Sequence, residues 1–156
     1  MRSTLYARWL IGLLCFFLPG ISYARKFPLA AASSVPAARG EVDVDHDNNG
    51  NAKLKIKAEY LSPPDALTPP ATAYIVWLQE RGAGGAPQSV GQLRVDKSRK
   101  ANFETVTPVK NFDLFVTAEQ DPTVKTPTGT EILSPAAKIT VIELSLLFHN
   151  PPSLPR

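Results

Sequence analysis

The feature of this chain that most constrains its fold is a run of five apolar residues, Tyr-Ile-Val-Trp-Leu, at positions 74–78. In an extended strand, three of these side chains would point to one face and the other two, Ile75 and Trp77, to the opposite face. Nearby prolines and glycines leave only about ten residues for the element, which suits a strand better than a buried helix. We therefore predict a central strand covered on both faces, with Trp77 in the core rather than acting as a stacking platform for a sugar.

Residues 1–24 have the pattern of a secretory signal peptide. Arg2 and Arg8 precede an apolar stretch at 9–18, and Ala24 ends a cleavage site made of small residues. The apolar stretch is shorter than the roughly 20 residues that a membrane-spanning helix needs. We therefore expect a protein that is exported to the periplasm or the extracellular space, with no stable membrane span once the signal is cleaved.

Cleavage would also change the charge and the cysteine content of the chain. Loss of Arg2 and Arg8 lowers the formal net charge from +3 to +1, because residues 1–24 contain no acid. The single cysteine, Cys15, would leave as well. Leu14 stands before it, where lipoprotein signals carry a small residue, so lipid attachment is not expected. The mature chain therefore has neither a disulfide nor the basic surplus that nucleic-acid binding requires.

The remainder of the chain consists of short extended runs separated by turn-forming residues. We expect a disordered leader at 25–39, one domain at 40–149 and a disordered tail at 150–156. The runs expected to form strands are 41–45, 53–60, 73–79, 89–95, 101–106, 112–119 and 137–148. The clearest is 53–60, where Leu54, Ile56, Ala58 and Tyr60 alternate with charged residues. The register of 137–148 cannot be fixed from its pattern.

This arrangement predicts an all-β fold. Seven short runs with no helical period outside the signal indicate a single immunoglobulin-like antiparallel β-sandwich of about seven strands after the N-terminal signal peptide. A small barrel is the alternative.

Five short motifs between residues 72 and 133 occur in a recognisable order. They are Tyr74-x-x-Trp77-Leu78, the glycine-rich turn 82–85, Ser89-x-Gly91, Val116-Thr117-Ala118-Glu119 and Pro127-Thr128-Gly129. Their order resembles the extracytoplasmic C-terminal domain of anti-sigma-K-type factors, a β-sandwich on the outer side of a bacterial membrane. Those factors also carry a cytoplasmic zinc-type sigma-binding module and a transmembrane helix. This sequence has neither, so the resemblance implies only the outer domain, as a sensing or binding module without catalytic residues.

One segment fits the opening of a calcium-binding loop. Asp45, Asp47 and Asn49 stand at alternate positions and Gly50 follows them, as in the pattern D-x-[DN]-x-[DN]-G. The twelfth position is Ile56, however, where a bidentate glutamate is needed. Because Asp, Asn and Gly are also ordinary hairpin residues, we predict a plain turn. These three residues are thus weak metal candidates, and no cofactor is expected.

The other polar residues do not form a catalytic pattern. His46 and His149 are far apart and lack ligand or triad spacing. The acids Glu80, Glu104, Asp113 and Glu119 occur singly and are expected on outer strand faces. The sequence therefore does not predict an enzyme.

The function that these observations favour is a secreted, non-catalytic binding or sensing module of the bacterial cell envelope. Long loops on a rigid β-domain are common binding sites, so we expect binding by the loops at 82–87 and 121–129. The expected partner is an envelope protein or a glycan, and not a nucleic acid. The alternatives are a structural surface or matrix protein and a carbohydrate-binding module.

Overall fold

The structure is a computed structural model that describes residues 25–82, 84–137 and 139–140. These residues form nine β-strands and one short 3₁₀ helix, η2 (Pro64–Ala66). The strands are β1 (Arg25–Ala31), β2 (Arg39–His46), β3 (Ala52–Glu59), β4 (Ala73–Glu80), β5 (Gln88–Leu93), β6 (Ala101–Thr107), β7 (Asn111–Glu119), β8 (Thr130–Pro135) and β9 (Ile139–Thr140). In the part of the chain that the structure describes, no helix is long and apolar enough to cross a membrane.

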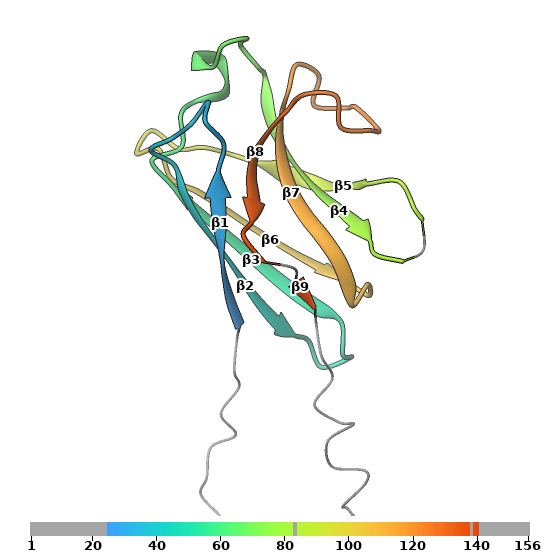
Figure 1. The fold of residues 1–156 in the computed structure, drawn as a ribbon. Coiled ribbons are helices and arrows are strands. Elements are labelled where there is room, and N and C mark those ends of the chain that lie inside the picture. The colour runs from blue at the N-terminus through green and yellow to red at the C-terminus, as the bar shows by residue number, and fades with distance from the viewer. Residues whose placement is uncertain (1–24, 83, 138, 141–156) are drawn as a thin grey trace, which may run out of the picture.

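The strands are joined in one continuous antiparallel sheet. Its order is β5-β4-β7-β8-β1-β2-β3-β6, and β9 pairs with β7. The two outermost strands, β5 and β6, approach each other, so the sheet nearly closes into a barrel (Figure 1). A β-bridge joins Val95, in the connection between these strands, to Ala101 at the start of β6. The predicted all-β, antiparallel fold is confirmed. The two separate sheets of an immunoglobulin-like sandwich are not confirmed, because a single ladder of hydrogen-bonded strands links all the elements.

Alternating apolar residues build the interior of this barrel. In β3, Leu54, Ile56 and Ala58 are buried, whereas the lysines between them lie on the outer face. The strand β4 is buried on both faces, as predicted. Its Tyr74, Val76 and Leu78 join the barrel interior. Its outward-facing residues Ala73, Ile75 and Trp77 form a second apolar cluster with Phe115 of β7 and Val124 of the β7–β8 loop. The predicted burial of Trp77 is confirmed.

Six of the predicted strands are confirmed to within two residues, but two parts of the prediction are wrong. The segment 25–39 is not simply a leader, because β1 pairs with both β2 and β8. Its alternation was hidden by Pro28 and by small alanines. Tyr60 is exposed rather than inward, because the backbone reverses there with a φ of 57°. The predicted run 137–148 lies mostly outside the described residues, as do 1–24 and 150–156.

The loops divide between the two ends of the barrel. Ala73 pairs with Glu119 and Glu80 pairs with Phe112, so the β7–β8 loop (120–129) and the β4–β5 connection (81–87) lie at opposite ends of β4 and β7. The β1–β2 loop (32–38) and the β3–β4 loop (60–72) are at the same end as the β7–β8 loop (Figure 1). We call this end the groove end.

Candidate ligand-binding groove

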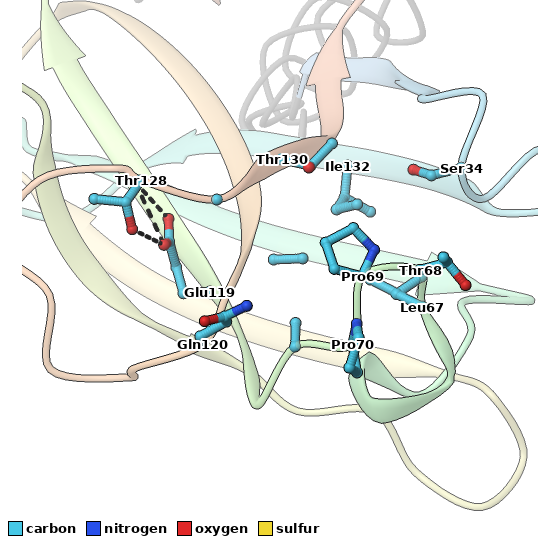
Figure 2. Close-up of a pocket in the computed structure, with 13 residues that line it drawn as sticks. Ser34, Leu67, Thr68, Pro69, Pro70, Glu119, Gln120, Thr128, Thr130 and Ile132 are labelled. Carbon is cyan, nitrogen blue, oxygen red and sulfur yellow. Dashed lines mark hydrogen bonds between the residues drawn. The ribbon is translucent and has the colours of Figure 1, made fainter.

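A groove of about 500 Å³ lies at the groove end of the barrel. The loops β1–β2, β3–β4 and β7–β8 contribute to it together with the first residues of β8. Its lining consists of Ser34, Leu67, Thr68, Pro69, Pro70, Ala71, Ala118, Glu119, Gln120, Thr128, Gly129, Thr130 and Ile132. Figure 2 shows Glu119, Gln120 and Thr128 on one side and Leu67, Thr68, Pro69 and Pro70 on the other. A volume of this size falls within the range of small-ligand sites.

One wall of the groove is fixed by a chain of hydrogen bonds that we call the Glu119 network. The indole Nε1 of Trp77 donates to Oγ1 of Thr117 over 2.8 Å, and this hydroxyl donates to Oε1 of Glu119 over 2.5 Å. Thr128 donates to the same carboxylate through its backbone N–H, 3.1 Å from Oε1, and its hydroxyl, 2.7 Å from Oε2. The network therefore ties the β7–β8 loop to the buried face of β4 and β7.

Glu119 lies on the outer face of β7, as predicted, but it is fully buried there. It is not exposed to solvent because the β7–β8 loop folds back over the outer face of β7 at this position. Burial alone would raise the pKa of Glu119, but the hydrogen bonds from Thr117, Thr128 and the Gly129 backbone outweigh it. The net result is a pKa below the usual value of 4.5. At neutral pH the side chain is therefore a carboxylate whose two oxygens both accept hydrogen bonds.

The opposite wall is held by contacts of the β3–β4 loop. The hydroxyl of Tyr74 donates to the carbonyl of Ser62 over 2.8 Å, and the Ala71 N–H donates to the Pro64 carbonyl over 2.9 Å. Burial, assisted by the negative charge of Asp65, raises the pKa of Tyr74 to about 12. Tyr74 therefore remains a neutral hydrogen-bond donor across the physiological range, and the proline-rich wall has a fixed position.

The weak metal candidates lie in the β2–β3 hairpin, away from the groove. Oδ1 of Asp47 accepts hydrogen bonds from the N–H groups of Asn49 and Asn51, each over 2.8 Å, and Oδ2 accepts one from the Asn51 side chain. Oδ1 of Asp45 accepts from the N–H of His46. Gly50 has a φ of 77°, as a tight turn requires. Within the described residues, no group of three or more His, Cys, Asp or Glu is placed to hold a metal ion.

Millimolar calcium is therefore expected to leave the melting temperature unchanged. A ligand that binds only the folded state must raise this temperature by mass action, and Asp47 already uses its carboxylate oxygens to close the hairpin. Thermal unfolding with calcium and with a chelator measures this directly. A calcium-dependent rise that Asp45→Ala abolishes would show that the hairpin is a metal site.

The other residues singled out in the sequence do not gather at one place. His46 is exposed at the end of β2, and His149 lies outside the described residues. Both loops at 82–87 and 121–129 were expected to bind, but they lie at opposite ends of the barrel. Only the second contributes to the groove, through Thr128 and Gly129.

The outer face of β1, β2, β3 and β6 carries paired charges. Lys53 and Lys55 lie 3.7 and 3.3 Å from the carboxylate oxygens of Glu104, and Lys57 lies 3.8 Å from both Glu41 and Asp43. These exposed pairs add little stability. The carboxylates of these pairs neutralise the charges of Lys53, Lys55 and Lys57, so this face offers no concentrated positive charge to an anionic ligand.

Comparison with protein-family models and with curated proteins found no match to this sequence. Some of the five short motifs noted in the sequence come together in the fold. Trp77, Thr117, Glu119 and Thr128 belong to three of those motifs, and they are the members of the Glu119 network. Ala118 and Gly129, which also line the groove, belong to two of these motifs, whereas the lining residues from the β1–β2 and β3–β4 loops had no signal in the sequence.

Acid is expected to destabilise the wild-type protein more than the Glu119→Gln variant. Because the pKa of Glu119 is lower in the folded state, its stabilising contribution is complete above its usual pKa. The contribution is lost as the pH falls through the lowered value. At about pH 7 the variant should lose about 1–3 kcal/mol, since a buried network then lacks its charged acceptor.

Denaturant unfolding at about pH 7 and about pH 3 measures both effects. Hydrogen bonds from Asn51 and Thr123 also lower the pKa values of Asp47 and Asp121, respectively. Both aspartates are present in the wild type and in the variant, so their effects on the pH dependence cancel in the comparison. If acidification lowers the free energy of unfolding equally in the two proteins, the pKa of Glu119 is not lowered in the folded state as we expect.

Proposed function

We propose that this chain is an exported, non-catalytic binding or sensing domain of the bacterial cell envelope, and that its ligand occupies the groove. The observation that carries this proposal is the groove itself, which is built by three loops on a rigid sheet. Both of its walls are held by hydrogen bonds, a buried one to Glu119 on one side and a partly buried one from Tyr74 on the other. A pre-formed site loses little conformational entropy on binding.

The chemistry of the lining supports binding rather than catalysis. Glu119 is the ionisable residue among those that line the groove, and both of its carboxylate oxygens already accept hydrogen bonds. A general base must reach a substrate proton with a free lone pair and a pKa near the working pH. The lowered pKa and the occupied oxygens of Glu119 fit a structural role.

The resemblance to the outer domain of anti-sigma-K-type factors supports a sensing role at the cell envelope. The immunoglobulin-like sandwich, which was predicted from the spacing of the short extended runs, remains part of the proposal. Residues 25–31, which would follow the expected cleavage after Ala24, form the strand β1. The N-terminal residues of the cleaved chain would then form a strand that pairs with β2 on one edge and with β8 on the other.

The exported chain is expected to begin at Arg25. Expression of the full sequence in a bacterium, followed by cell fractionation and N-terminal sequencing, measures this. Leu13→Arg is the control, because a charge in the apolar stretch should keep the chain uncleaved inside the cell. An envelope form that starts at Met1, or at Cys15 with lipid attached, would contradict the proposed processing.

A bulky residue at the rim tests whether binding occurs in the groove. Gln120 is exposed at the rim and Gln88 is exposed at the other end of the barrel, so Gln120→Trp and Gln88→Trp form a matched pair. The probes are neutral peptides and soluble glycan fragments of the cell wall, applied to the immobilised protein. Gln120→Trp should weaken binding at least about tenfold, and Gln88→Trp should not. Equal binding by both variants would place the site elsewhere.

A further inference from the structure

We propose that the groove accepts an uncharged, extended peptide segment of a partner protein, with one apolar side chain of that segment packed against the proline-rich wall. This inference rests on the proposed function and adds the chemical class of the ligand. Three properties of the lining support it: its charge, its apolar walls and the polar groups at its rim.

The charge of the groove favours a neutral ligand. Glu119 is the one ionisable residue among the lining residues, and Thr117 and Thr128 already donate hydrogen bonds to it. A cationic ligand would have to compete with these donors for the carboxylate. An anionic ligand would meet no lining cation and would lie near a buried negative charge. Either ion would lose hydration without gaining a partner, which is costly.

The walls of the groove favour an apolar anchor. Leu67, Pro69 and Pro70 form one side and are at least partly exposed, whereas Ala118 of β7 and Ile132 of β8 are buried. The prolines have no N–H, so this wall presents hydrocarbon and few hydrogen-bond donors. A buried aliphatic or aromatic side chain would gain free energy here in proportion to the apolar area removed from water.

The rim of the groove supplies neutral hydrogen-bonding groups. The side chains of Ser34, Thr68, Gln120 and Thr130 are exposed there, and hydroxyl and amide groups both donate and accept. This combination suits the alternating N–H and C=O groups of a peptide backbone.

A sugar ring fits the groove less well than a peptide does. A sugar carries hydroxyls on most of its carbons, and those facing the proline wall would lose water without finding partners. Among the described residues that line the groove, none is aromatic, so a flat stacking surface is missing. The lining therefore favours a peptide with one apolar side chain over a glycan.

The test is a calorimetric titration of the mature protein with short, end-capped neutral peptides that carry leucine at the central position. Matched peptides replace that leucine with alanine, glutamate or lysine, and a neutral cell-wall oligosaccharide serves as the competing ligand class. Exchanging leucine for alanine should weaken binding at least about tenfold, and either charged replacement should weaken it at least as much. Gln120→Trp should abolish the leucine-dependent binding, whereas Gln88→Trp should retain it.

The outcomes separate this inference from the proposed function. If the oligosaccharide or a charged peptide binds more tightly than the leucine peptide, and Gln120→Trp blocks it, the groove is a binding site but the peptide inference is wrong. If the leucine peptide binds equally well to Gln120→Trp, the proposed site is wrong as well. Failure of every probe to bind the wild-type protein would count against both.

Discussion

Replacing Trp77 by alanine is expected to lower the free energy of unfolding by about 3–5 kcal/mol. Trp77 is fully buried among Ala73, Ile75, Phe115 and Val124. Truncation leaves a cavity there and removes the Nε1 hydrogen bond to Thr117. A small domain has roughly 5–15 kcal/mol of stability in total, so the variant should unfold at a much lower denaturant concentration or fail to accumulate as folded protein.

The matched control is Tyr60→Ala, which also removes an aromatic ring. Tyr60 is 56% exposed, so this change should cost less than about 1 kcal/mol. Urea unfolding of the two variants, followed by circular dichroism, gives both values. Similar midpoints for Trp77→Ala and wild type, together with a loss of oligosaccharide binding, would instead make Trp77 part of a carbohydrate site.

Replacing Gly129 by alanine is expected to have the second-largest effect. A Cβ atom at this position would lie 1.8 Å from the carbonyl oxygen of Ala118 and 3.1 Å from Oε2 of Glu119. The first contact is with backbone that is part of the sheet and cannot rotate away. Relief requires a shift of the β7–β8 loop, so we expect a loss of about 3 kcal/mol, at the upper end of overpacking effects. Because Gly129 and Thr128 line the groove, ligand binding should weaken as well.

Gly85→Ala is the control for this change. A Cβ at Gly85 would meet no atom within 4 Å, so stability should stay within about 0.5 kcal/mol of wild type. The comparison uses denaturant unfolding together with the peptide titration. Wild-type stability and binding in Gly129→Ala would show that the loop is not held against β7 as described.

The strands were predictable from the sequence where side chains alternate strongly. The pattern of 53–60 predicts β3, and the apolar run at 74–78 predicts the strand with two buried faces. The strand β8 was missed because Ile132 and Leu133 are both buried, so its residues do not alternate. The register shift between Val116 and Thr117 of the neighbouring β7 accommodates this break.

Of the groove, only the contribution of the loop at 121–129 was predicted from the sequence. The lining residues are separated by up to about a hundred positions along the chain, and no single loop carries a ligand-binding pattern. Glu119 looked like a solvated acid because it alternates with inward-facing Phe112, Leu114, Val116 and Ala118. Glu119 is buried only because the β7–β8 loop folds back over it. Burial by a loop produces no periodic pattern of apolar residues in the sequence.

The most direct test of the central claim, that the ligand occupies the groove, is to map backbone amide shifts by NMR during titration with the tightest-binding probe. The proposed site predicts shifts at Ser34, Gln120, Thr128 and Thr130, with the signals of Gly85 and Gln88 unchanged. Shifts concentrated at Gly85 and Gln88, with the four groove signals unmoved, would contradict the claim and assign binding to the opposite end of the barrel.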